Sequence, residues 1–87
     1  AQLRYGLGNE LLKAGRFDNA VDQLRRAVAH DPRYSAAWKL LGQALAAADR
    51  TNDAIQAYEN GLRAAEENGD LQAAKEMTVF LKRLRKP

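Results

Sequence analysis

The sequence predicts an all-α protein made of two helix–turn–helix units followed by one capping helix, five helices in all. Three observations predict this fold. The 87-residue chain is rich in Ala and Leu and has only two Pro, a composition that favours helix. Its apolar residues recur at three- and four-residue spacing. Residues 1–34 also match residues 35–68, with six identical pairs, and a period of 34 residues is typical of repeat proteins.

The first repeat, residues 1–34, is predicted to hold two helices. The first helix covers residues 1–14 and ends at Gly15, because glycine readily takes the left-handed conformation of a helix C-terminus. Its inward face is expected to carry Leu3, Leu7, Leu11 and Ala14. The second helix begins at Phe17 and ends at His30, since Asp31 precedes a proline and avoids the helical region. Its inward residues are Ala20, Val21, Leu24, Ala27 and Val28.

The second repeat, residues 35–68, is predicted to hold the next two helices. Ser35 and Thr51 are expected to cap them, because a hydroxyl can accept a hydrogen bond from a free backbone N–H. The residues of the third helix that are predicted to face inward are Ala37, Trp38, Leu41, Ala44, Leu45 and Ala48. Those of the fourth helix are Ala54, Ile55, Tyr58, Leu62 and Ala65. Small residues where helices cross are expected to allow close packing; they are Gly8, Ala20, Ala27, Gly42, Ala54 and Gly61.

The last segment, residues 69–87, is predicted to be a capping helix with a basic tail. Gly69 stops the preceding helix, and Asp70 caps a fifth helix over residues 71–84. This helix starts one residue out of the repeat register, so Met77 is expected where the repeat has a small residue. Val79 is expected to be exposed. The inward residues are Ala73, Ala74, Met77, Phe80, Leu81 and Leu84.

The two repeats, residues 1–34 and 35–68, resemble the tetratricopeptide repeat (TPR). The TPR unit has the pattern W-x₂-L-G-x₂-Y followed by Ala, an aromatic, a small residue and Pro. The second unit reads Trp38, Leu41, Gly42, Leu45, Ala54, Tyr58 and Gly61; the first reads Arg4, Leu7, Gly8, Leu11, Ala20, Leu24, Ala27 and Pro32. Departures are Arg4 for Trp, Leu for Tyr in both units, and Glu66 for the second Pro. The resemblance covers about 68 residues and implies that residues 1–87 form a single TPR-like domain, a right-handed superhelical array.

The resemblance also implies a function, the binding of a peptide or helix of a partner protein in a concave groove lined by the first helix of each pair. The groove residues carried over are Gln2, Tyr5, Asn9, Leu12, Ala36, Lys39, Gln43 and Ala46. Amides can pair with a peptide backbone, and Lys39 suits a carboxylate. The family's clamp for a C-terminal carboxylate is not expected, because Tyr5 and Leu40 stand at its Lys and Asn positions.

An enzyme is not expected. His30 is the only histidine and lies beside Asp31 at a helix end, where interaction with the helix dipole explains it. Cysteine is absent, and no catalytic or phosphate-binding motif occurs, so neither a metal site nor a cofactor is predicted. A chain without a signal peptide or an apolar membrane span weakly favours the cytoplasm, although the compartment is left open.

Nucleic acid and membrane are not expected as partners. The net charge of +3 arises from a C-terminal cluster, Lys82, Arg83, Arg85 and Lys86. Residues 1–81 carry ten Lys and Arg against eleven Asp and Glu, so the body is nearly neutral. Basic residues in the last turn of a helix are expected from the helix dipole.

Self-association stays open as an alternative. Two and a half repeats form a thin array, and Ala1 at the start suggests a segment of a longer TPR protein. Apolar residues of the terminal helices would then form the interface, as a homodimer or against further repeats.

Overall fold

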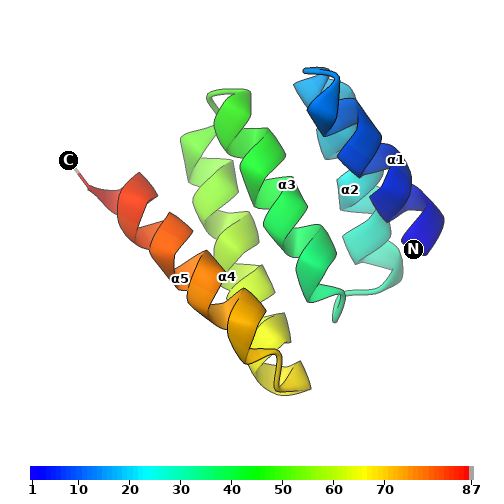
Figure 1. Cartoon of the computed structure of the whole chain (residues 1–87). Coiled ribbons are helices and arrows are strands. Elements are labelled where there is room, and N and C mark those ends of the chain that lie inside the picture. The colour runs from blue at the N-terminus through cyan, green and yellow to red at the C-terminus, as the bar shows by residue number, and fades with distance from the viewer. Residues whose placement is uncertain (87) are drawn as a thin grey trace.

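A computed structural model describes residues 1–86, which fold into five helices without a strand (Figure 1). The helices are α1 (Gln2–Lys13), α2 (Phe17–His30), α3 (Ser35–Ala47), α4 (Thr51–Asn68) and α5 (Leu71–Arg85). Pro87, the last residue of the predicted basic tail, lies outside the described residues. The predicted all-α helical repeat fold is therefore confirmed, with each helix end within two residues of its expected place.

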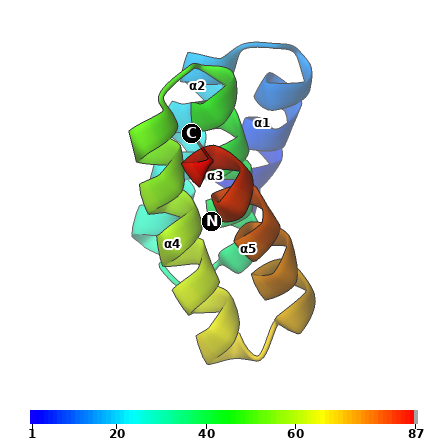
Figure 2. The same ribbon diagram turned by 90° about the vertical axis from the view of Figure 1, so that its left-hand side faces the viewer.

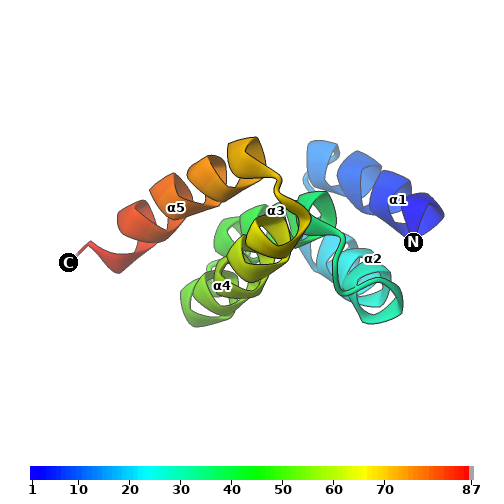
Figure 3. The same cartoon turned by 90° about the horizontal axis from the view of Figure 1, so that it is seen from below.

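The helices form two rows. Seen from below, α1, α3 and α5 make the upper row, and α2 and α4 lie beneath (Figure 3). Consecutive helices pack against each other, and α3 also touches both α1 and α5. Short turns force consecutive helices to run antiparallel, as α3 and α4 do (Figure 2). The first helix of each pair thus shares a row with α5, and this row presents the candidate binding surface.

Equivalent turns join the two helices of each pair. Gly15 has a φ of +76°, and Asp49, which lies 34 residues later, has a φ of +61°. Asp is among the few non-glycine residues that enter this left-handed region with modest strain. The second turn therefore keeps the geometry of the first, although its sequence lacks glycine.

Three glycines allow neighbouring helices to approach closely. A Cβ atom on Gly8 would lie 2.5 Å from Cγ of Leu24, and one on Gly42 would lie 2.5 Å from Cζ of Tyr58. A Cβ on Gly61 would lie 2.5 Å from Sδ of Met77. Each glycine thus accepts a large side chain from the neighbouring helix. The sequence predicted the close packing at these positions, but not that Gly61 would receive Met77 of α5.

The fifth helix is displaced by two residues from the repeat register, where the sequence suggested one. The N-caps of α3 and α5 are Tyr34 and Asp70, which lie 36 residues apart. The displacement arises because α4 has 18 residues against 14 in α2, while the link from α4 to α5 is two residues shorter than that from α2 to α3. Pro32 prevents α2 from continuing, whereas Glu66 at the equivalent position lets α4 add a turn. Thr78, rather than Met77, therefore stands where α3 has Gly42.

The capping predictions were partly wrong. Asp70 caps α5 as expected, because its carboxylate accepts a hydrogen bond from the Ala73 N–H at 3.2 Å. Ser35 and Thr51, in contrast, are the first residues of their helices, which begin without a side-chain cap. Ser35 is buried, and its hydroxyl donates to Oδ2 of Asp70 at 3.1 Å. A charged acceptor makes the stronger hydrogen bond, so Ser35 links α3 to α5.

The inward face predicted for α1 was also partly wrong. Leu3 is 76% exposed and Leu7 is 44% exposed, because none of the other described helices covers this side of α1. The remaining large apolar residues that are exposed, Leu71 at 70% and Val79 at 45%, lie on α5. Unburied apolar surface is thus concentrated at the two ends of the array, where one helix lacks a neighbour.

Tyr58 should make the protein sensitive to alkaline pH. Burial raises the pKa of this phenol to about 12, from 10.0 in a free chain. The folded protein therefore holds the proton more tightly than the unfolded chain, so this stabilisation is complete below pH 10 and is lost between pH 10 and about 12. We expect a loss of about 2–3 kcal/mol over that range. Urea unfolding at several pH values checks this, and Tyr58→Phe should lose stability less steeply; an equally steep loss would contradict it.

Candidate protein-binding surface

The predicted site residues lie on two helices of the same row. We call them the first-helix surface, which consists of Gln2, Tyr5, Asn9 and Leu12 of α1 and Lys39 and Gln43 of α3. Their spacing of three and four residues places them along one side of each helix. Gln2 is exposed, and the other five are half-buried. The half-buried Ala36 and Ala46 of α3 occupy the remaining predicted positions.

Tyr5 is held by an aromatic contact within the chain. Its ring stacks on that of Tyr34, with centroids 5.1 Å apart and planes inclined by 29°. Tyr34 is the N-cap of α3, so the stack joins α1 to the beginning of α3. Burial raises the pKa of the Tyr34 phenol, and the charges of Tyr5 and Asp31 raise it further. Tyr5 therefore presents a fixed ring, which loses little conformational freedom on contact with a partner.

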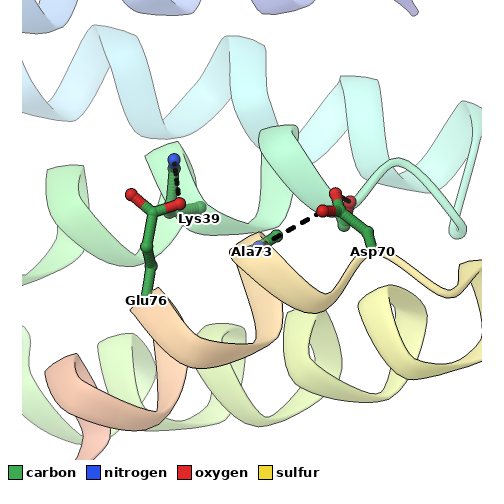
Figure 4. A network of polar contacts seen from close by, with 5 residues as sticks. Lys39, Asp70, Ala73 and Glu76 are labelled. Carbon is green, nitrogen blue, oxygen red and sulfur yellow. Dashed lines mark hydrogen bonds and ion pairs between the residues drawn. The ribbon is translucent and has the colours of Figure 1, made fainter.

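Lys39 already has a carboxylate partner. Its Nζ lies 3.1 Å from Oε1 of Glu76, which α5 contributes (Figure 4). The lysine side chain is 25% exposed and the glutamate side chain 38% exposed, so solvent screens this pair only in part. Together with the Ser35–Asp70 hydrogen bond, the pair fastens α5 to α3. Lys39 was expected to suit an acidic partner, and within this structure its charge is largely neutralised.

Reasoning from the sequence missed what α5 adds to this row. The 36-residue offset makes Lys75 equivalent to Lys39, and Val79 equivalent to Gln43. Both residues are exposed. The 34-residue period would instead have selected Ala73 and Met77, which are buried. The one signal in the sequence was Glu66 in place of proline, since it allows α4 to lengthen.

A hollow of about 450 Å³ lies on the opposite side, between α2 and α4. Its floor includes Trp38, Leu41 and Leu45 of α3. The Trp38 indole N–H donates to the Pro32 carbonyl at 2.8 Å, which fixes the ring at one end. Arg25 and Asp53 face each other across the hollow at 3.9 Å, with both side chains about half exposed. The sequence did not predict this feature, because it depends on the separation of two helices whose backbones do not pack against each other.

The described residues offer neither a cluster of metal ligands nor a membrane span. Across residues 1–86, no three His, Asp or Glu side chains come together as a metal would require. None of the five described helices is both long and apolar enough to cross a membrane.

Comparisons with known proteins agree with this architecture. The profile of the tetratricopeptide repeat family matches residues 5–68. A TPR repeat-containing protein of Pseudomonas aeruginosa is 54% identical over 84 residues, which are 97% of this chain and 80% of that protein. The small glutamine-rich tetratricopeptide repeat-containing protein 2 of Mycosarcoma maydis is 35% identical over 48 residues, which are 55% of this chain and 14% of that protein. Proteins of this family mediate protein–protein interactions, and the repeat itself is a non-catalytic fold.

Solved structures give the same result. A protein of Bordetella parapertussis is 46% identical and superposes with a TM-score of 0.86, over 95% of this chain and 72% of that one. The TPR domain protein of Salinibacter ruber is 30% identical, with a TM-score of 0.87 over 95% of this chain and 84% of that one. The repeat boundaries at residues 34 and 68 stay predictions of the periodicity. The chain belongs to the tetratricopeptide repeat family.

Proposed function

We propose that the first-helix surface binds an extended or helical segment of a partner protein. The observation that carries this proposal concerns Asn9 and Gln43, which lie 34 residues apart at equivalent positions of α1 and α3. Both are half-buried, and among the hydrogen bonds of residues 1–86 neither amide side chain has a partner. An amide can both donate to and accept from a peptide backbone. Two such groups in successive repeats suit a ligand that runs across the row.

The charge of this surface supports an uncharged ligand segment. Glu76 neutralises Lys39, and Asn9 and Gln43 are neutral amides. Tyr5 and Leu12 add half-buried apolar area beside them. The surface should therefore select a segment through backbone hydrogen bonds and apolar side chains rather than through a charged terminus.

The test is a selection of peptides from a random display library on the wild-type protein, followed by affinity measurements on variants. We expect Asn9→Ala combined with Gln43→Ala to weaken the selected peptides by about tenfold or more, because two hydrogen bonds are lost. The matched control is Asn19→Ala combined with Asn52→Ala, which removes two exposed amides from α2 and α4. An equal loss of peptide affinity in both double variants, or no loss in either, would refute the proposal.

Self-association is a second candidate, favoured by the open side of α1. Leu3 and Leu7 are exposed there at 76% and 44%, and apolar surface left uncovered at an end is typical of interfaces. Sedimentation equilibrium of the wild type and of Leu3→Glu with Leu7→Glu tests it. A dimer that the double variant abolishes supports this candidate, and a monomeric wild type at high concentration excludes it.

A further inference from the structure

The outer side of α5 is an open apolar face. Leu71 is 70% exposed and Val79 is 45% exposed. Beside them, a hollow of about 530 Å³ runs between α4 and α5. Its walls include Leu62 and Glu66 of α4 and Leu71, Ala74, Lys75 and Thr78 of α5. We call this region the α4–α5 face. It lies at the end of the array, where α5 has no further helix beside it (Figure 1).

The architecture indicates what kind of element fits the α4–α5 face. With the 36-residue offset, Leu71 and Thr78 correspond to Ser35 and Gly42 of α3. On α3 these two positions are buried, and Gly42 packs directly against Tyr58 of α4. Ser35 bonds to the N-cap of α5, whereas Gly42 is covered by α4, which runs antiparallel to α3. The side of α5 around Thr78 is therefore shaped to be covered by a helix running antiparallel to α5. Because Thr78 replaces the glycine, that helix needs a small residue at the point where α4 has Tyr58.

Charge indicates which helix fits. Lys75 follows Leu71 by four residues and Lys82 follows Lys75 by seven, so all three lie along one side of α5. Both lysines are exposed, and neither joins any ion pair among residues 1–86. Arg85, in contrast, pairs with Glu59 of α4. Glu66 of α4 is the one acidic residue that lines the hollow, so the unpaired charges along this side of α5 itself are those of the two lysines.

We propose that the α4–α5 face docks an acidic amphipathic helix of a partner protein, antiparallel to α5. Its apolar stripe would cover Leu62, Leu71 and Ala74, and its acidic flank would meet Lys75 and Lys82. A second copy of this chain fits less well, because an α5–α5 pair places the lysines of both copies at one interface and like charges repel. This surface goes beyond the proposed function, since it does not use Asn9 or Gln43.

The test uses a synthetic amphipathic peptide with Leu at the a and d heptad positions, except for Ala at the central one that is to face Thr78, and Glu on both flanks. The peptide has 18 residues, the length of α4. Its matched twin has Lys in place of every Glu. Each is titrated into ¹⁵N-labelled protein, and amide shifts and affinity are recorded. We expect the acidic peptide to shift amides of α4 and α5 around Leu62, Leu71 and Thr78, and to bind at least tenfold more tightly than the basic twin.

Two exposed-site variants test the assignment without disturbing the core. Lys75→Glu with Lys82→Glu should reverse the preference, so that the basic twin binds more tightly than the acidic peptide. Lys13→Glu, a charge change on the exposed part of α1, should leave the preference unchanged. Equal binding of the two peptides overturns the proposal, as does the absence of shifts on α4 and α5. Amide shifts confined to Asn9 and Gln43 overturn it too. A wild-type protein that forms a dimer without peptide, and loses that dimer in the Leu71→Glu variant, also overturns it.

Discussion

Gly42→Ala is expected to destabilise the protein by about 1–3 kcal/mol, even though alanine is the better helix former. The added methyl group would lie 2.5 Å from Cζ of Tyr58, well inside van der Waals contact. Tyr58 is only 2% exposed, and its ring is packed against Phe80 at 5.3 Å, so it has little room to move away. Separating α3 from α4 would disturb the most extensive helix pair of the fold.

Gly6→Ala is the matched control for this prediction. Gly6 also lies in a first helix, but a Cβ atom there would meet nothing within 4 Å. The substitution should therefore stabilise the protein by up to about 1 kcal/mol through helix propensity alone. Urea unfolding followed by circular dichroism measures both variants. Opposite signs are expected, and a stabilised Gly42→Ala protein would show that the close approach of Tyr58 is unimportant.

Phe80→Asp should cost about 2–4 kcal/mol, because it places a charge where α5 packs on α4. Phe80 is half-buried, and its ring contacts that of Tyr58 with planes inclined by 30°. The neighbouring Met77 is fully buried and packs against Gly61, so loosening α5 at Phe80 also exposes Met77. Chemical denaturation followed by Trp38 fluorescence and by circular dichroism measures this loss.

Val79→Asp is the control, since it introduces the same charge at the adjacent position. Val79 is 45% exposed, and an exposed substitution should change stability by less than about 1 kcal/mol. Similar losses for the two variants would mean that α5 tolerates charge on either side. In that case Phe80 would not help α5 to cover α4.

The sequence predicted those parts of the fold that local chemistry decides. Gly15, Pro32 and Gly69 end three helices where expected, because each has a backbone preference that does not depend on distant neighbours. Asp70 caps α5 for a similar reason, because its accepting carboxylate and the donating N–H of Ala73 are only three residues apart. The contacts of Gly8 with Leu24 and of Gly42 with Tyr58 were also predictable, because the 34-residue period repeats them.

The predictions that failed concern residues whose environment depends on partners distant in the sequence. Ser35 has the side chain of a cap, yet it donates to Asp70, which is 35 residues away in sequence. Leu7 has the spacing of a core residue, yet its side of α1 has no neighbour among the described helices. Lys39 was assigned to the candidate site without its partner Glu76, because the added turn of α4 shifts α5 out of the period. Periodicity specifies the face of a helix, but it does not specify what lies opposite.

The pattern of helix contacts has a consequence for folding kinetics. Every contact between helices joins elements that are adjacent along the chain or one removed, and within residues 1–86 α1 never meets α5. Such a low contact order favours folding on the microsecond to millisecond scale. It also means that the two ends can open separately, so amide exchange should be fastest in α1 and α5 and slowest in α3. A repeat inserted in the middle would then lengthen the protein while leaving the interfaces at both ends unchanged.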